Sequence, residues 1–401
     1  MVKAAADILK LVRPDILEML GYEPIEPSDL LAERLGIPAE QVVKLDGNEN
    51  PYGPSPRVLE ALGAIEDYHR YPDPQQRALR QALAGYAGCE PEQIVAGHGS
   101  DELIDLLLRA VIAPGDGVID CPPTFGMYGF STRVAGGRVI EVARRDDYSL
   151  DIDGVRSAAG EAKVVFVTSP NNPTGNPLTE AELEALLAMG LLVVVDEAYV
   201  EFAGRGYASL VADRENLVVL RTFIKWAGLA GLRAGYGIMP PALAEVLMQI
   251  KPPYTPNVAA EVAMLASLED RERLMERVQT IVQERERLSR GLGALEFVEV
   301  YPSQANFVLA RLKPGLRGGE ADLRGGEEGL DARAGEDGPD APRREPVRAR
   351  AVYDQLAQRG IFVRYFDTPR LRDCLRISVG LPDHTDRLLE ALQELGGERG
   401  R

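Results

Sequence analysis

Short apolar runs that end in polar residues recur through the central part of the chain. Residues 164–167, 191–195 and 217–220 are continuously apolar and rich in β-branched side chains, which is typical of strands buried on both faces of a sheet. Between the first two runs, residues 180–189 have the apolar spacing of a helix. This order predicts a right-handed βαβ unit in a parallel sheet.

Further apolar runs extend this sheet on both sides of the unit. Residues 94–96 and 118–121 read as strands, and residues 235–239 read as a short strand whose direction is also compatible with antiparallel pairing. We therefore predict an α/β fold with a mostly parallel sheet flanked by helices.

The pattern changes in a long charged helix predicted near residues 271–292. Beyond it, apolar runs at 297–300 and 305–310 predict a β pair, and runs at 361–364 and 375–379 predict two more strands of a smaller α+β domain. The predicted division is an N-terminal arm (1–45) that belongs to the small domain, a large domain (46–275) and a small C-terminal domain (276–401). Within the latter, residues 315–347 have many glycines, mixed charges and no aromatic residue, and predict a flexible insertion.

Charge and cysteine content narrow the class of protein. The formal net charge of −17 argues against general binding of nucleic acid or anionic membranes, so an anionic substrate would need local arginines. Three cysteines without a CxxC pair give neither a metal site nor a disulfide framework. We found no apolar stretch of about 20 residues and no secretory pattern, and we expect a cytoplasmic protein.

Polar side chains follow several of the predicted strands where each strand ends. Asn172, Asp196 and Tyr199 follow two neighbouring strands, and Lys225 follows the next one. Because parallel strands share one carboxyl edge, where open α/β sheets place ligands, we expect these side chains to converge there. A lysine at this place is suited to hold an aldehyde cofactor covalently.

Pyridoxal phosphate suits these residues. Lys225 would bind the aldehyde and later move a proton, and Asp196 would pair with the protonated pyridine nitrogen. Tyr199 and Asn172 would hydrogen-bond the phenolic oxygen. Phe125 would cover a ring face, although it could equally fill the core. The predicted phosphate ligands are the backbone N–H groups of Ser100 and Asp101, the Thr222 hydroxyl and Arg233.

Two arginines interrupt the apolar strands of the small domain. Arg364 and Arg376 would require an anion because a buried guanidinium without one is unfavourable. The anion could be a protein carboxylate or part of the substrate. The chain lacks the G-x-G-x-x-G and GxxxxGK motifs of dinucleotide and nucleotide sites, which disfavours a nicotinamide or P-loop enzyme.

Eight motifs carry a resemblance to a known family. The chain resembles the fold-type I, class-II pyridoxal-phosphate-dependent aminotransferases, and within them the histidinol-phosphate aminotransferases, over nearly all of its length except the insertion. The motifs are Leu45-Asp46-Gly47-Asn48-Glu49-Asn50-Pro51-Tyr52-Gly53, Arg70-Tyr71-Pro72, Gly99-Ser100-Asp101-Glu102, Pro122-Pro123-Thr124-Phe125-Gly126-Met127-Tyr128, Ser169-Pro170-Asn171-Asn172-Pro173-Thr174-Gly175, Asp196-Glu197-Ala198-Tyr199, Leu229-Ala230-Gly231-Leu232-Arg233 and Leu375-Arg376-Ile377.

The resemblance implies a seven-stranded large-domain sheet and a homodimer with sites at the subunit boundary. It implies that Tyr71 reaches the cofactor phosphate of the other subunit, and that Tyr22, Arg364 and Arg376 receive the substrate phosphate. The implied reaction is amino transfer between L-histidinol phosphate with 2-oxoglutarate and imidazole-acetol phosphate with L-glutamate, in L-histidine biosynthesis.

The sequence departs from the family pattern before the lysine. Ile224 stands where the family usually has a serine that donates to the cofactor phosphate, which would remove one hydrogen bond to a charged group, about 1.5–3 kcal/mol at most. Phe125 stands where tyrosine is common. The alternatives are a related aminotransferase for aromatic amino acids, an enzyme similar to threonine-phosphate decarboxylase, and a pyridoxal-phosphate-binding protein that has lost catalysis.

Overall fold

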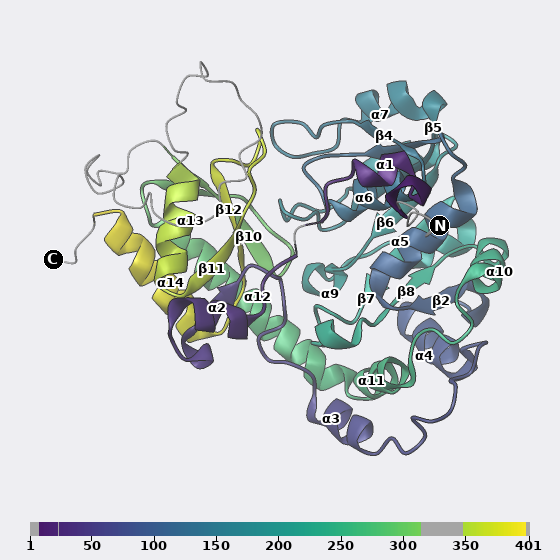
Figure 1. Cartoon of the computed structure of the whole chain (residues 1–401), viewed down its shortest axis with the longest axis horizontal. Helices are drawn as coiled ribbons and strands as arrows, with labels where there is room; N and C mark the ends of the chain where they lie inside the picture. Colours follow the sequence, from purple (N-terminus) through teal and green to yellow (C-terminus); the bar gives the residue numbers. More distant parts are fainter. Residues whose placement is uncertain (1–7, 23, 314–347, 398–401) are drawn as a thin grey trace, which may run out of the picture.

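The large sheet agrees with the sequence prediction. The structure, a computed structural model, describes residues 8–22, 24–313 and 348–397, so the predicted insertion lies outside the described residues. The sheet has seven strands in the order β2-β8-β7-β6-β5-β3-β4 (Figure 1). Neighbouring strands are parallel except β8, which is antiparallel to both β2 and β7. The strands are β2 (Ile94–Gly97), β3 (Gly117–Asp120), β4 (Arg138–Glu141), β5 (Ala162–Thr168), β6 (Leu192–Asp196), β7 (Leu217–Thr222) and β8 (Gly235–Ile238).

Both faces of this sheet are covered by helices, which explains its continuously apolar strands. In β6, Val194 packs into a core formed with α5, α6 and α10, whereas Val193 and Val195 pack into the core on the opposite face. The helices around the sheet are α3 (Pro56–Gly63), α4 (Arg77–Ala87), α5 (Gly99–Val111), α6 (Met127–Val134), α7 (Ile152–Ala158), α8 (Glu180–Leu187), α9 (Val200–Ala203), α10 (Pro241–Ile250) and α11 (Val258–Glu269).

The βαβ unit shows how local sequence directs a strand end towards the site. Helix α8 begins after Thr179, whose hydroxyl accepts a hydrogen bond from the Glu182 N–H, while the Glu182 carboxylate accepts from the Thr179 N–H. This reciprocal capping fixes the start of the crossover helix. The chain then returns as β6, parallel to β5, and Asp196 is its last residue.

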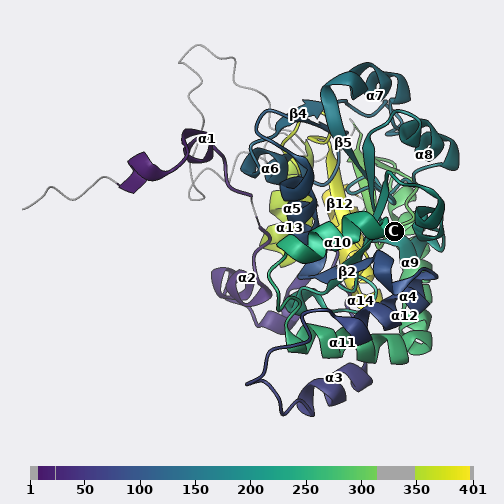
Figure 2. The same ribbon diagram turned by 90° about the vertical axis from the view of Figure 1, so that its right-hand side faces the viewer.

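A second sheet of five strands forms the other lobe of the molecule, with the order β1-β11-β12-β10-β9 (Figures 1 and 2). Its first strand comes from the N-terminal part of the chain and pairs in parallel with β11. The long helix α12 (Arg271–Gly293) connects the two lobes. The other elements are β1 (Val43–Leu45), β9 (Val298–Val300), β10 (Phe307–Leu312), β11 (Ile361–Tyr365), β12 (Cys374–Ser378), α1 (Pro14–Leu17), α2 (Ser28–Leu35), α13 (Arg348–Gln358) and α14 (Pro382–Leu395), and the short 3₁₀ helices Ile8–Leu11, Ala39–Gln41, Pro91–Gln93, Ala159–Glu161, Ala208–Asp213 and Ala230–Leu232.

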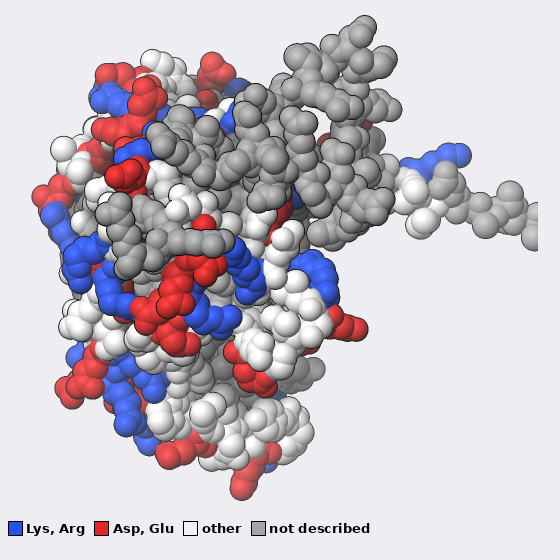
Figure 3. All heavy atoms as spheres, turned by 90° about the vertical axis from the view of Figure 1, so that its left-hand side faces the viewer, with Lys and Arg blue, Asp and Glu red and all other residues white. Residues whose placement is uncertain are grey.

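The outer face of the smaller lobe is strongly charged. Acidic and basic side chains are interspersed over it (Figure 3). In the part of the chain that the structure describes, no helix is both long and apolar enough to cross a membrane.

Candidate active site

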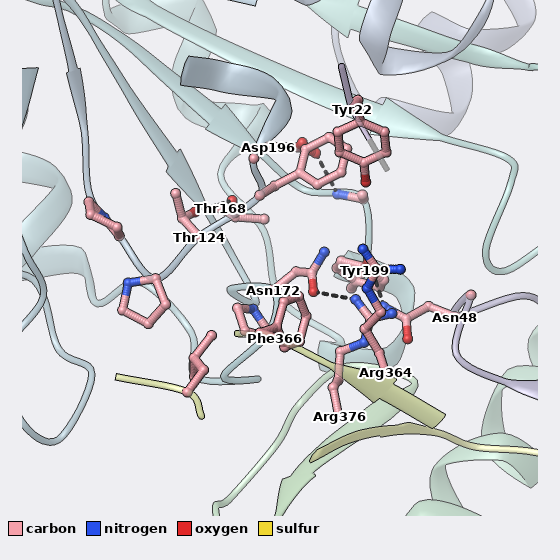
Figure 4. A pocket seen from close by; sticks show the side chains of 18 of the residues that line it. Tyr22, Asn48, Thr124, Thr168, Asn172, Asp196, Tyr199, Arg364, Phe366 and Arg376 are labelled. Atoms are coloured by element: carbon pink, nitrogen blue, oxygen red, sulfur yellow. Dashed lines mark hydrogen bonds between the residues drawn. The ribbon is translucent and has the colours of Figure 1, made fainter. Parts of the chain in front are cut away.

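A cavity of about 990 Å³ lies at the carboxyl ends of the large-sheet strands, where the two lobes meet (Figure 4). Its walls come from β5, β6 and β7, from the loop before α6, and from β11 and β12 of the small sheet. The structure thus brings together all but one of the predicted site residues. These are Tyr22, Ser100, Asp101, Phe125, Asn172, Asp196, Tyr199, Thr222, Lys225, Arg233, Arg364 and Arg376.

Lys225 lies three residues beyond the end of β7, and its amine is inside the cavity. Nζ donates a hydrogen bond to the carbonyl oxygen of Gly47 at 3.2 Å. Burial, followed by repulsion from the nearby Arg376 guanidinium, lowers the pKa of Lys225 to about 8. A larger fraction of the amine is therefore neutral near neutral pH than for an exposed lysine, which suits a nucleophile or a base.

Asp196 presents a carboxylate at the floor of the cavity. Its Oδ2 accepts a hydrogen bond from the Tyr128 hydroxyl at 2.7 Å, and its Oδ1 accepts from the Ala198 N–H at 3.0 Å. Burial raises the pKa of Asp196 to about 6, although both hydrogen bonds oppose the rise. The carboxylate is therefore mainly ionised at pH 7 and can pair with a protonated ring nitrogen.

Tyr199 lines the cavity and lies beside Asn48 (Figure 4). The hydroxyl oxygen accepts a hydrogen bond from Asn48 Nδ2 at 3.1 Å, and the ring meets Phe307 edge-on at 5.2 Å. Burial raises the pKa of Tyr199 to about 12, while Arg376 and the Asn48 hydrogen bond act in the opposite direction. The phenol therefore keeps its proton and is a hydrogen-bond donor at neutral pH.

Asn172 and Arg376 are joined across the two lobes. Arg376 Nη1 donates to Asn172 Oδ1 at 2.7 Å, and Nη2 donates to the carbonyl oxygen of Asp46. The Asn172 amide oxygen is thus occupied, so its NH₂ group remains as the donor for a ligand. Arg364 lines the same cavity and is the register partner of Arg376 across β11 and β12.

A turn between β2 and α5 forms the end of the cavity where the cofactor phosphate is predicted to bind. Gly99 has φ = +80°, and a Cβ atom at Gly235 of β8 would lie 2.8 Å from the Gly99 carbonyl carbon, so this close approach requires glycine. Ser100 and Asp101 follow in the first turn of α5, where backbone N–H groups favour anions. Arg233 Nη2 donates to Asp101 Oδ2 at 2.7 Å, which holds the guanidinium beside this turn.

Thr222 and Ile224 offer fewer hydrogen-bond donors to a bound phosphate than two free hydroxyl groups would. The Thr222 hydroxyl donates to the carbonyl oxygen of Ala234 at 3.0 Å and accepts from the Ile224 N–H at 3.1 Å. Its proton is therefore not available to a phosphate in this arrangement. The Ile224 side chain also lines the cavity and offers no donor.

Tyr71 is the predicted site residue that the structure does not place at the cavity. Its side chain is 78% exposed and stacks on Tyr254 with 4.1 Å between ring centroids. Its contact with another subunit stays a prediction.

The sequence analysis missed two residues whose side chains hydrogen-bond to the predicted catalytic groups. Tyr128 is fully buried and donates to Asp196, and Asn48 donates to Tyr199. Both lie in motifs that were recognised, but the aromatic loop was interpreted through Phe125 and the early loop had no assigned partner. The helical direction of residues 127–134, which turns Tyr128 towards the sheet, was the signal available for the first.

The donor set fits pyridoxal phosphate. An amine, a carboxylate, a phenol and an amide NH₂ group surround one space, and a helix start with an arginine closes one end. Phe125 lines this space and meets Tyr128 edge-on at 5.6 Å, so its ring is available to cover a cofactor ring. The amine suits the aldehyde of that cofactor, the carboxylate suits its ring nitrogen, the phenol and the amide both suit its phenolic oxygen, and the helix start with the arginine suits its phosphate.

Comparison with known proteins defines the class. Residues 40–392 match the family model described as aminotransferase class I and II. The chain belongs to this family.

Several relatives within this family are histidinol-phosphate aminotransferases. The chain is similar to the histidinol-phosphate aminotransferase of Roseiflexus castenholzii, with 49% identity over 97% of this chain and 99% of the relative. It is 43% identical to the chloroplastic histidinol-phosphate aminotransferase of Nicotiana plumbaginifolia over 95% of this chain and 86% of the relative. Among solved structures, it resembles the histidinol-phosphate aminotransferase of Sinorhizobium meliloti in complex with pyridoxal-5'-phosphate, with a TM-score of 0.79, 28% identity, and 97% and 98% of the two chains covered.

Proposed function

We propose that this chain is a pyridoxal-phosphate-dependent aminotransferase that exchanges an amino group between L-histidinol phosphate and 2-oxoglutarate, in L-histidine biosynthesis. The observation that carries the proposal is one cavity that combines the Lys225 amine and the Asp196 carboxylate with Arg364 and Arg376. Near-full-length similarity to histidinol-phosphate aminotransferases supports the choice of substrate.

The position of each residue in the cavity determines its proposed role in the reaction. When bound, pyridoxal phosphate supplies an electron sink for the charge left when the substrate carbon loses its proton. Lys225 Nζ would hold the cofactor aldehyde, and as a free amine it would act as the base that takes the proton from the substrate carbon and returns it. Asp196 would pair with the protonated ring nitrogen. Tyr199 and the Asn172 NH₂ group would donate to the phenolic oxygen, and Arg233 with the first turn of α5 would hold the cofactor phosphate.

The small-sheet arginines orient the substrate. Arg376 lies at the boundary of the two lobes and already contacts Asn172. A substrate phosphate on Arg364 and Arg376 would therefore place the substrate between the cofactor and the small sheet, with charge-assisted hydrogen bonds that fix its direction. Tyr22 lines the same cavity and would contribute a further hydroxyl.

A steady-state assay tests the proposed substrate. Purified protein supplied with pyridoxal phosphate should form glutamate from 2-oxoglutarate with histidinol phosphate at a far higher kcat/KM than with phenylalanine, and should not release carbon dioxide from threonine phosphate. Lys225→Ala should abolish transfer, whereas Lys163→Ala, at a half-exposed lysine that pairs with Asp116 on the surface, should not. Preference for phenylalanine, or decarboxylation of threonine phosphate, would reject this assignment.

We further propose that the enzyme is a homodimer in which Tyr71 contributes to the site of the partner. The exposed stack of Tyr71 on Tyr254, which is 43% exposed, supports this because exposed aromatic pairs are typical of interfaces. Mixing Tyr71→Ala chains with Lys225→Ala chains should restore one intact site per hybrid dimer. A monomer by sedimentation, or no recovery on mixing, would contradict the proposal.

Two broader assignments accompany this function. We propose the domain division 1–45 with 276–401 and 46–275, supported by the pairing of β1 with β11 and by the course of α12 across residue 275. We also propose a cytoplasmic location, supported by three cysteines that are all free thiols.

A further inference from the structure

The loop that carries Asp46, Gly47 and Asn48 touches both lobes at the site. The Asp46 carbonyl accepts from Arg376, and the Gly47 carbonyl accepts from Lys225. Asn48 is 1% exposed and contacts Tyr199 on the large-sheet side and Ser378 of β12 on the other side. This loop therefore links the Tyr199 hydroxyl to the small sheet through hydrogen bonds.

The hydrogen bonds of Asn48 have a direction that the geometry fixes. The Asn48 backbone N–H donates to Ser378 Oγ at 2.9 Å, so that hydroxyl oxygen acts as an acceptor there. The hydroxyl proton is then free to donate to Asn48 Oδ1 at 2.8 Å. Because Oδ1 is the acceptor, the other end of the amide is the NH₂ group, and it must be the donor to the Tyr199 hydroxyl.

The orientation of the Asn48 amide determines where the Tyr199 hydroxyl can donate its proton. A hydroxyl oxygen that accepts from an amide keeps its own proton for a different acceptor. Among the described residues, Asn48 is the hydrogen-bond partner that the structure gives to the Tyr199 hydroxyl, and this hydroxyl lines the cavity. Its proton is therefore directed into the cavity, towards a ligand.

We propose that Asn48 is a positioning residue that forces the Tyr199 hydroxyl to donate to the bound cofactor, and that Ser378 sets the orientation of the Asn48 amide. The inference rests on the proposed function because it assumes that pyridoxal phosphate occupies the cavity. It ties the hydrogen bonding of the cofactor to the place of the small sheet, since Asn306 Nδ2 also donates to the Asn48 carbonyl at 3.0 Å.

The backbone of this residue limits which side chains can stand there. Asn48 has φ = +51°, a left-handed conformation that asparagine, aspartate and glycine adopt more readily than other residues. Aspartate and glycine therefore separate the effect of the side chain from the effect of the backbone. Asn48→Asp has the same shape but can only accept from Tyr199 when ionised, and Asn48→Gly removes the contact.

The test is the pH titration of the colour of the bound cofactor without substrate, which reports how strongly its phenolic oxygen is held in the deprotonated form. In Asn48→Asp the carboxylate captures the Tyr199 proton, so the apparent pKa of the chromophore should rise by about one unit or more. Asn48→Gly and Ser378→Ala should each give a smaller rise, because Tyr199 keeps its proton but loses its fixed direction.

A matched control separates the effect of hydrogen-bond direction from the effect of an added negative charge. Asn50→Asp introduces the same charge in the same loop, but the Asn50 amide donates to the Trp226 carbonyl and does not contact Tyr199. Its chromophore pKa should move by less than half the shift of Asn48→Asp. Equal shifts in these two variants would overturn the inference. If Asn48→Asp does not fold, unchanged titrations in both Asn48→Gly and Ser378→Ala would overturn it. Wild-type turnover of histidinol phosphate, measured separately, decides the proposed function.

Discussion

Replacing Tyr128 with phenylalanine tests how the protein keeps Asp196 ionised. The hydroxyl donates to Asp196 Oδ2, while the ring stacks on Phe166 at 4.9 Å and meets Phe125 edge-on. Phenylalanine keeps both ring contacts and removes the hydroxyl alone. Thr168 loses its contact with Tyr128 but keeps one with Thr124 at 3.3 Å, so the packing of the site should survive.

The size of the effect follows from the hydrogen bond that is lost. A hydrogen bond to a charged group contributes about 1.5–3 kcal/mol, and each 1.36 kcal/mol corresponds to one pKa unit. The Asp196 pKa, which is about 6 in the intact site, should therefore rise by about one to two units in Tyr128→Phe. At pH 7 half or more of the carboxyl groups would then be protonated and unable to pair with the ring nitrogen.

The assay is the pH dependence of cofactor affinity, measured by equilibrium absorbance on the apoprotein. Wild-type affinity should fall as the pH drops through about 6, because the raised pKa means that Asp196 is ionised above this value and protonated below it. Tyr128→Phe should move the midpoint up by about one to two units and weaken binding at pH 7, with little loss at pH 9. Tyr148→Phe removes a different buried hydroxyl that donates to the Arg370 carbonyl and should leave the midpoint in place. An unchanged midpoint in Tyr128→Phe would refute the reasoning.

Four further predictions follow from the same geometry. Ile224→Ser adds a donor beside the cofactor phosphate and should tighten cofactor binding by about tenfold or more, since such a bond contributes about 1.5–3 kcal/mol; equilibrium dialysis that shows no gain would contradict it. The rate of covalent cofactor capture by Lys225 should rise with pH and level off above about 8, whereas stopped-flow data with a midpoint near the ordinary 10.5 would show that burial does not lower this pKa. Arg376→Met should raise KM for histidinol phosphate by about a hundredfold, because a charge-assisted pair is lost, and should affect a phosphate-free amine donor much less. Glu197→Gln should destabilise the protein by about 3–5 kcal/mol in urea unfolding, because Glu197 is fully buried and pairs with Arg221 at 2.8 Å; a loss below about 1 kcal/mol would place this pair among weak surface contacts.

The site residues that could be predicted from the sequence are those at or just beyond the ends of strands. Asp196 ends β6, while Asn172 and Lys225 lie a few residues beyond β5 and β7, which flank β6 in the sheet. Continuous apolar runs identify such strands, and parallel packing then brings their polar ends to one edge. The convergence of these three residues therefore follows from local patterns, without knowledge of long-range contacts.

The supporting hydrogen bonds could not be predicted in this way. Asn48 meets Ser378 across 330 residues of chain, and nothing in either local sequence specifies the pairing. Tyr128 was hidden for a different reason, because its motif offered two aromatic residues and the pattern could not tell which one covers a ring and which one reaches a carboxylate. Thr222 lines the cavity as predicted, yet its hydroxyl donates to the carbonyl oxygen of Ala234, 12 residues further along the chain.

The sequence left open whether the anion that meets Arg376 is a protein carboxylate or part of the substrate. The surroundings of Arg376 in the structure bear on this choice. Its hydrogen bonds go to the Asn172 amide oxygen and the Asp46 carbonyl, both uncharged, and its guanidinium lies over the rings of Phe307 and Phe366. Its Nε has no hydrogen-bond partner among the described residues. Within that same part of the chain, no carboxylate forms an ion pair with this guanidinium, and burial together with the neighbouring Arg364 lowers its pKa. A buried cation next to a second cation, with one donor unused, is unfavourable in isolation and becomes favourable when an anion enters the cavity. This balance of charge supports the proposal that a phosphate of the substrate, and not a protein carboxylate, is the anion that Arg376 meets.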